Sequence, residues 1–455
     1  MNGDRARSDG FLLLCLGALI FVATGFLMIT AQGGIGLDFK LAVYNSARCL
    51  FEHRDPYNPA DLLQMYRETG GKLPPDCCGD LETLLSETRY VYPPTSFAVT
   101  LPLAILPLRV AFVLWTLLAA GGYITAAAMV WEIGKAHAPR LTGALLCLLL
   151  ANSGTLICTG NASSLAISLS IIGACCLLRE RAVVFGIVCT AMSLALKPQD
   201  SYLIWLALFL MGGTVRKRAM HTVAVFAGAT VPVLLWVWHI APHWLSELHS
   251  HVLYMIAPGG MGDPGPANVL KRGTMAYTNL QSVLSLIRDD PRFYNLASYA
   301  IGLLMVGIFA VVSLKFQSDK EDRWLAIAFA AGVTLLPSYH RNYDAKLLLL
   351  TIPACALLWS RNGPMRKLAL FVTTLGLLMP SDLPWAIYLA LTASLKLTGI
   401  WQRAYFYSRA LPIPCAIAIV ASFYLVAYTI SLRRGDRSGG LTRSPRSRAS
   451  DMEHA

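Results

Sequence analysis

The sequence predicts an all-α polytopic membrane protein. Hydrophobic residues make up 55% of the 455 residues and charged residues only 14%, and the mean hydropathy is +0.53. Soluble domains carry roughly 25% charged residues. A bilayer requires about 20 apolar residues per helix, and uncharged runs of this kind recur from Phe11 almost to Leu432. These runs are too many and too evenly spread for a soluble domain with a single anchor.

The first apolar run, Phe11 to Ala31, follows two arginines, as a signal peptide does. No convincing small-x-small cleavage site follows it and further hydrophobic segments come after, so we interpret it as a retained first helix. The remaining apolar runs predict helices at 109–132, 141–158, 162–178, 182–196, 200–213, 219–241, 293–314, 324–337, 345–360, 366–380, 384–398 and 410–432.

Basic residues define the expected orientation. Basic loops fall at alternate gaps between the runs, at Lys135–Arg140, Arg179–Arg181, Arg216–Arg218, Lys315–Arg323 and Arg361–Lys367. The positive-inside rule places them, the amino terminus and the Arg-rich tail in the cytosol, so the net charge of +12 indicates membrane topology and not nucleic-acid binding. Thirteen spans would leave the tail outside; we therefore expect about twelve.

This topology predicts a membrane domain over residues 1–432 and a basic, disordered cytoplasmic tail over 433–455. Two long loops, 32–94 and 242–292, then lie on the extracytoplasmic face of a plasma (inner) membrane protein. The short polar segments Lys197–Asp200 and Ser338–Asp344 lie on the same face. We expect the chemistry at this face.

Asp38 follows the first helix directly, at the level of the membrane interface. A carboxylate there could act as a general base for an acceptor hydroxyl while a lipid-linked donor stays in the bilayer. The alternative is that Asp38 only caps the helix predicted over Phe39–Glu52, one side of which is apolar.

Three cations are candidates for binding an anionic phosphate on this face. Lys197 lies between two short apolar runs, where it could also be a snorkelling lysine. His340 and Arg341 lie in a dense polar loop, and arginine can bind phosphate in a bidentate fork.

Histidine and cysteine do not form a recognised metal motif. His239, His243, His249 and His251 are close in sequence, but no His-Glu-x-x-His or carboxylate pair completes a zinc site. The adjacent Cys77 and Cys78 are in a polar loop, and a metal or redox role for them is the less favoured alternative. We expect no metal and no cofactor.

An ordered set of short motifs resembles glycosyltransferase family 87, formerly domain of unknown function 2029, whose members are similar to polyprenyl-phosphate-mannose-dependent mannosyltransferases. The motifs extend over some 300 residues and are Asp38-Phe39 with Tyr44 and Asp55-Pro56-Tyr57, Tyr90-Val91-Tyr92-Pro93-Pro94, Gly160-Asn161, Leu196-Lys197-Pro198 and His340-Arg341. Two features depart from the family pattern, because Asn161 stands where Gln is expected and the loop between Asn58 and Arg89 is expanded.

The resemblance implies a GT-C-type bundle of about twelve transmembrane helices with extracytoplasmic loops. It implies a hexosyltransferase that moves a hexose, with mannose the first candidate, from a polyprenyl-phosphate sugar to a lipid or glycan acceptor with inversion. Asp38 would be the base, and Lys197, His340 and Arg341 would bind the donor phosphate. Substrate contacts are implied for Tyr44, Asp55, Tyr57, Tyr92 and Asn161. The expected partners are these substrates and membrane lipids.

A transporter or flippase is the main alternative, and a polymerase or ligase of lipid-linked saccharides is another. Transporters usually carry charged groups near the bilayer midplane and internal symmetry. The predicted helix interiors here are almost free of charge and show no repeat, which favours an enzyme acting at the interface.

Overall fold

The computed structural model describes residues 2–31, 34–70, 89–260, 262–265, 277–316, 319–361, 363–384, 386–387, 390, 399–401 and 411–442. Within these ranges the secondary structure is helical, apart from one isolated β-bridge between Tyr277 and Arg341. Cys77 and Cys78, and most of the predicted helix 384–398, lie outside the described residues. The helix count of about twelve is therefore not confirmed.

Six helices among the described residues are long and apolar enough to cross a membrane. They are α1 (Asn2–Ala31), α6 (Leu108–Gly134), α9 (Ala162–Arg179), α12 (Gly213–Ile240), α16 (Pro291–Lys315) and α22 (Pro412–Thr442). These helices correspond to predicted ones, and they confirm that the chain is a helical membrane protein.

Shorter helices complete the bundle. They are α7 (Pro139–Ala151), α8 (Thr155–Cys158), α10 (Val183–Leu196), η4 (Pro198–Asp200), α11 (Tyr202–Leu210), α17 (Asp322–Thr334), η5 (Asp344–Leu350), α18 (Thr351–Ser360) and α19 (Met365–Leu378). The helix predicted over 141–158 is divided into α7 and α8, because Lys346 and Asp382 bind the turn between them. The Lys346 ammonium donates to the carbonyl of Asn152 (2.5 Å), and Asp382 accepts from the backbone N–H and hydroxyl of Thr155.

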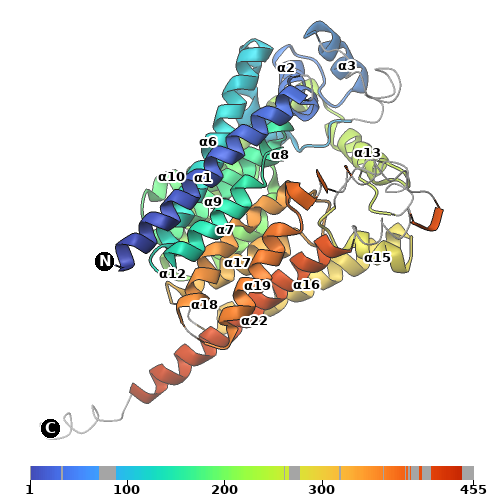
Figure 1. Ribbon diagram of the computed structural model, residues 1–455. Coiled ribbons are helices and arrows are strands. Elements are labelled where there is room, and N and C mark those ends of the chain that lie inside the picture. Colours follow the sequence, from blue (N-terminus) through green and yellow to red (C-terminus); the bar gives the residue numbers. More distant parts are fainter. Residues whose placement is uncertain are drawn as a thin grey trace, which may run out of the picture.

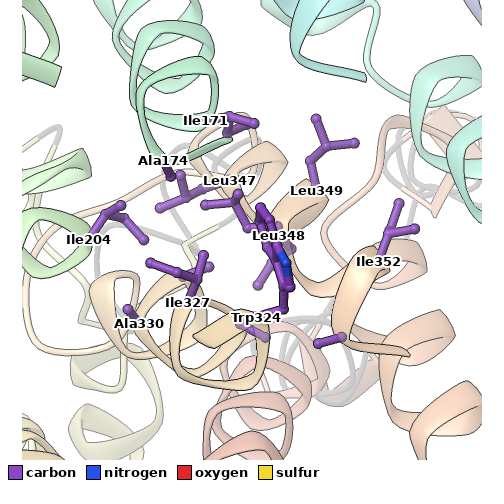
Figure 2. Packing of buried hydrophobic residues seen from close by; sticks show 14 of the residues in the cluster. Ile171, Ala174, Ile204, Trp324, Ile327, Ala330, Leu347, Leu348, Leu349 and Ile352 are labelled. Carbon is purple, nitrogen blue, oxygen red and sulfur yellow. The ribbon is translucent and has the colours of Figure 1, made fainter. Parts of the chain in front are cut away.

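The core of the bundle is formed by α9, which the other helices surround. In its most apolar stretch 89% of the residues are buried, against 11% in α12, so α9 is central and α12 faces the surroundings of the bundle. Figure 2 shows the packing at this centre, where apolar side chains from α9, α11, α17, η5 and α18 interdigitate. The labelled residues are Ile171, Ala174, Ile204, Trp324, Ile327, Ala330, Leu347, Leu348, Leu349 and Ile352.

The two long polar segments form short helices at one end of the bundle. The first contains η1 (Phe39–Asn45), α2 (Ser46–Phe51) and α3 (Pro59–Glu68), and the second contains α13 (Trp244–Ile256) and α15 (Gln281–Ile287). The stretch Thr95–Leu108 forms only short turns, η2 (Pro94–Ser96), α5 (Phe97–Thr100) and η3 (Leu101–Ile105), because Pro102 and Pro107 interrupt it. Figure 1 places α2, α3, α13 and α15 at the end opposite the start of α1 and the end of α22.

The basic loops gather at the end that carries the start of α1 and the end of α22. Ion pairs connect them across the bundle, joining Arg140 to Asp9, Arg218 to Glu180, Lys320 to Glu180 and Arg361 to Asp322. The alternation of basic and polar gaps in the sequence thus corresponds to two opposite ends of the bundle. We call the end with α2, α3, α13 and α15 the loop end, and the other the basic end.

Candidate active site

Asp38 lies at the loop end, where the chain turns from α1 into η1. Two glycines let this turn approach the start of α9. A Cβ atom on Gly36 would lie 2.5 Å from the carbonyl oxygen of Thr159, and one on Gly160 would lie 2.6 Å from the Cβ of Phe39. Gly160 also has a φ of +60°, a conformation that glycine adopts without strain. The close approach brings the Asp38 carboxylate next to Asn161, the N-cap residue of α9.

The Asp38 side chain does not cap the helix that follows it. Instead, one of its oxygens, Oδ2, accepts a hydrogen bond of 2.9 Å from the side-chain amide of Asn161. The same amide nitrogen lies 3.3 Å from the hydroxyl of Tyr343. The sequence left open whether Asp38 only caps the following helix. The structure excludes this interpretation, because the carboxylate is held by the side chain of Asn161.

Asn161 itself caps α9. Its side-chain oxygen accepts from the backbone N–H of Ser163 (2.9 Å), from the Ser163 hydroxyl (2.8 Å) and from the Tyr92 hydroxyl (3.1 Å). Tyr92, a candidate from the Tyr-x-Tyr-Pro-Pro motif, therefore forms a hydrogen bond with Asn161, the residue that holds Asp38.

Lys197 lies beside this group and is almost fully buried, with 5% of its surface exposed. Its ammonium is 2.5 Å from the Ser163 hydroxyl, 2.7 Å from Asp344 and 3.3 Å from Asp200. The contacts with Ser163 and Asp344 are hydrogen bonds and the contact with Asp200 is an ion pair, so the ammonium is held within the protein. Lys197 is consequently not a snorkelling residue.

Charge pairing sets the protonation of this buried group. Burial alone would lower the pKa of Lys197, but the charges of Asp200 and Asp344 raise it above its ordinary value. Burial would raise the pKa of Asp344, but Lys197 lowers it. The pKa of Asp200 is raised, by burial and then by the charge of Asp344. The group therefore holds a charged lysine and a charged Asp344.

His340 and Arg341 follow α17 and differ in accessibility. His340 is fully buried, with one ring nitrogen 3.2 Å from Asp200 and the other 3.0 Å from the carbonyl of Ser338. Arg341 is only partly buried, its guanidinium donates to the Tyr339 hydroxyl, and its backbone N–H donates to Asp344 (2.8 Å). Burial would lower the pKa of Arg341, but neighbouring tyrosines and the charge of Asp38 raise it further above its ordinary value.

A cavity of about 280 Å³ opens beside the cluster. The polar side of its lining includes Tyr92, Lys197, Gln199, Tyr339 and Tyr343, and the apolar side comes from α13 and α16. The apolar lining residues of these two helices include Val252, Met255, Ile256, Tyr294 and Tyr299. The cavity therefore has a polar side that includes Lys197, and its apolar side includes α16, a membrane helix that is largely exposed along its length.

Three predicted substrate contacts lie away from this cluster. The Tyr44 hydroxyl donates to the carbonyl of Leu106 (2.7 Å). Asp55 accepts from the backbone N–H of Tyr57 (2.8 Å), and the Tyr57 hydroxyl donates to the carbonyl of Tyr92 (2.9 Å). Tyr57 is completely buried. In this structure these three side chains shape the loop end, and only Tyr92 and Asn161 of the predicted substrate contacts join Asp38.

Ser163, Asp200, Tyr343 and Asp344 were not among the candidate site residues predicted from the sequence. Asp200 and Asp344 stand within the two polar segments that the sequence singles out, and an aspartate three residues after a buried lysine is a usable signal. Ser163 carries no signal of its own, because its role depends on the position of Lys197. Among the described residues, no group of three or more His, Cys, Asp or Glu side chains could hold a metal ion.

Comparison with known proteins identifies the protein family. The sequence model of glycosyltransferase family 87 matches residues 90–338, which is more than half of the chain. The chain belongs to glycosyltransferase family 87. It is therefore a membrane glycosyltransferase with a donor and an acceptor substrate. Searches of curated proteins and of solved structures gave no significant match.

The family match covers only part of the cluster. Tyr92, Asn161 and Lys197 lie within the matched residues, whereas Asp38, His340 and Arg341 lie outside them. The family assignment therefore establishes the reaction class, and the roles of the individual side chains depend on the geometry.

Proposed function

We propose that this family 87 protein transfers a hexose, mannose being the first candidate, from a polyprenyl-phosphate sugar to a lipid or glycan acceptor outside the cytoplasm. The observation that carries this proposal is the position of the Asp38 carboxylate. It is held by Asn161 at the loop end of the first membrane helix, and Tyr92 and Tyr343, which contact Asn161, line a cavity with one polar and one apolar side.

In the proposed reaction, Asp38 takes the proton of an acceptor hydroxyl. The hydroxyl oxygen attacks the anomeric carbon of the donor sugar as the bond from that carbon to the phosphate oxygen breaks, and the polyprenyl phosphate leaves with the electron pair. Attack from the face opposite the leaving group inverts the configuration. A base within hydrogen-bonding reach of the attacking hydroxyl contributes roughly 10²–10⁴-fold to such a step.

The leaving phosphate requires positive charge, and Arg341 is the best-placed cation. It is only partly buried, and it lies close enough to Asp38 to interact with it electrostatically. Lys197 is already held by hydrogen bonds to Ser163 and Asp344 and by an ion pair with Asp200, and His340 is fully buried against Asp200. We therefore propose direct phosphate binding by Arg341, with Lys197 and His340 contributing through the potential of the buried cluster.

A lipid carrier is supported by the apolar side of the cavity. Its wall includes side chains of α16, a membrane helix of which only 28% of the most apolar stretch is buried, so a chain in the bilayer could approach from that side. A GT-C-type bundle, a plasma (inner) membrane location and an extracytoplasmic loop end agree with the separation of the basic end from the loop end. The family assignment does not favour a flippase or transporter.

The donor class is tested with purified protein and radiolabelled polyprenyl-phosphate-mannose, using membrane lipid extract as the source of acceptors. We expect labelled product from this donor and none from GDP-mannose, since the leaving group is a lipid phosphate. Transfer from the nucleotide sugar alone would contradict the proposal. Transfer only from another polyprenyl-phosphate hexose would retain the mechanism and change the sugar.

A further inference from the structure

The amide of Asn161 has a fixed orientation. Its oxygen position faces the backbone N–H of Ser163 at 2.9 Å, and a backbone N–H can only donate. That position must therefore be the oxygen, and the nitrogen must face Asp38 at 2.9 Å. The Tyr92 hydroxyl, 3.1 Å from the same oxygen, adds a further donor. Asn161 consequently presents N–H donors to Asp38 and not a carbonyl oxygen.

The hydroxyl of Ser163 is oriented by Lys197. The ammonium nitrogen lies 2.5 Å from the Ser163 oxygen, and an ammonium can only donate. Ser163 therefore accepts from Lys197 and directs its own proton to the Asn161 oxygen, 2.8 Å away. Asp344 accepts a second N–H group of Lys197, and Asp200 forms an ion pair with the same ammonium, so the two carboxylates hold the ammonium in place beside Ser163.

We propose that Asn161 and Ser163 are positioning residues for Asp38, and that Lys197 sets the direction of the hydrogen bonds that connect them. The chain runs from Lys197 through Ser163 and Asn161 to one oxygen of Asp38. Lys197, Ser163 and Asn161 are each at least 94% buried, so water does not compete for these bonds. With Oδ2 held in this way, Oδ1 is the oxygen that receives the acceptor proton. This inference rests on the proposed function insofar as Asp38 is the base.

Two variants test the chain, and a neighbouring serine supplies a matched control. Ser163→Ala removes the hydroxyl and keeps the backbone N–H that Asn161 caps. Asn161→Asp keeps the cap oxygen and the size but replaces the donor that faces Asp38 with an acceptor. Ser164→Ala is the control, because the Ser164 hydroxyl is equally buried and donates only to the backbone carbonyl of Asn161.

We expect kcat for sugar transfer to fall roughly tenfold or more in Ser163→Ala and further in Asn161→Asp, with donor KM nearly unchanged. Ser164→Ala should retain the wild-type kcat. The proposal is overturned if Ser163→Ala keeps its kcat, if the two serine variants lose activity equally, or if only donor KM rises, as loss of a phosphate contact would cause.

A second readout does not depend on transfer. Labelling of Asp38 by a water-soluble carbodiimide and an amine, quantified by peptide mass spectrometry, reports how firmly the carboxylate is held. We expect several-fold faster labelling of Asp38 in Asn161→Asp than in wild type or Ser164→Ala. Equal labelling rates would overturn the positioning role, whether or not the protein transfers sugar. Absence of sugar transfer in the wild type would count only against the proposed function.

Discussion

The ammonium of Lys197 is held inside the protein by hydrogen bonds to Ser163 and Asp344 and by an ion pair with Asp200, and this changes what a cation at this position can do. The sequence predicts that Lys197 and the segment Ser338–Asp344 both border the membrane at one face, and the structure brings them together. The pairing of Lys197 with Asp344 joins positions that are 147 residues apart. Such a partner depends on how α10 and η5 pack against α9, so the residue types could be predicted but not the bonds between them.

Arg341 is the residue whose proposed role differs from those of the other two cations. Arg341→Lys keeps the charge but loses the planar fork, and Arg341→Gln loses both. We expect donor KM to rise roughly tenfold in Arg341→Gln and less in Arg341→Lys, because charge-assisted hydrogen bonds to a phosphate are lost. Steady-state kinetics with varied donor checks this. Arg288→Gln, at an exposed arginine of the same end, should keep the wild-type KM, and an equal rise there would contradict a specific phosphate contact.

Apolar helices were predictable from the sequence, including the shorter α10, α11, α17 and α19, whereas the helices of the second polar segment were not. Apolar runs of sufficient length identified α1, α6, α9, α12, α16 and α22, because a membrane helix is determined mainly by hydrophobicity and length. The prediction of one continuous helix over 141–158 was wrong, because the helix is interrupted at Asn152. The turn there binds Lys346 and Asp382, which come from distant parts of the chain. The helices α13 and α15 were missed because they lie within a loop that carries no membrane signal.

Helix α13 forms one wall of the cavity, and a pair of carboxyl groups attaches it to the loop after α2. The carboxyl groups of Asp55 and Glu247 face each other, and burial, followed by their mutual charge, raises the pKa of Glu247; burial first raises that of Asp55. His251 of α13 is near the carbonyl of Tyr90 (2.9 Å), and Trp244 packs against Tyr57. The attachment thus contains one contact that depends on protonation.

The pKa of Glu247 is raised in the folded protein by burial, by the charge of Asp55 and by a hydrogen bond from the Glu247 carboxyl to Asp55, so the contribution of this contact to stability is complete below the ordinary pKa of Glu247. It is lost as the pH rises through the raised pKa of Glu247. Glu247→Gln should remove this loss, since the amide can donate to Asp55 when it is ionised. Thermal unfolding in detergent between about pH 4 and pH 8 measures the effect.

Glu68→Gln is the control for this pH effect. The pKa of Glu68 is lowered, first by its hydrogen bond to Gln64 and then by that to Arg54. Its contribution to stability is therefore lost as the pH falls, which is the opposite direction. A Glu247→Gln variant whose unfolding temperature depends on pH as in wild type would contradict the role of the carboxyl pair.

Across the whole molecule, charge separates the two ends of the bundle. The end of α19 lies at the loop end, where Asp382 binds Thr155, and α22 reaches the basic end, where Ser431 binds Asp322. Residue 384 and the start of α22 therefore lie at the same end, which agrees with the start of α1 and the end of α22 both lying at the opposite, basic end (Figure 1). A single membrane domain over 1–432 and a tail over 433–455 remain predictions, and residues 443–455 lie outside the described residues.

The orientation of the bundle is open to a direct test in intact cells. Cysteines introduced at Arg288 of the loop end and Lys320 of the basic end are matched, since both side chains are highly exposed. In a background that carries Cys77→Ser, Cys78→Ser and serine in place of the exposed Cys15 and Cys415, we expect a membrane-impermeant maleimide to label Arg288→Cys and not Lys320→Cys. The reverse pattern would place the loop end in the cytosol and would contradict an extracytoplasmic site.

The most direct test of the central claim is the rate of sugar transfer from a polyprenyl-phosphate sugar by Asp38→Asn beside wild type. Asparagine keeps the size of the side chain and removes the base, so we expect transfer to fall roughly 10²–10⁴-fold while donor binding and thermal unfolding stay close to wild type. Asp290→Asn, at the cap of α16 on the same end, is the control, because asparagine caps a helix as well as aspartate does. Transfer by Asp38→Asn at a rate near that of wild type would contradict the assignment of Asp38 as the base.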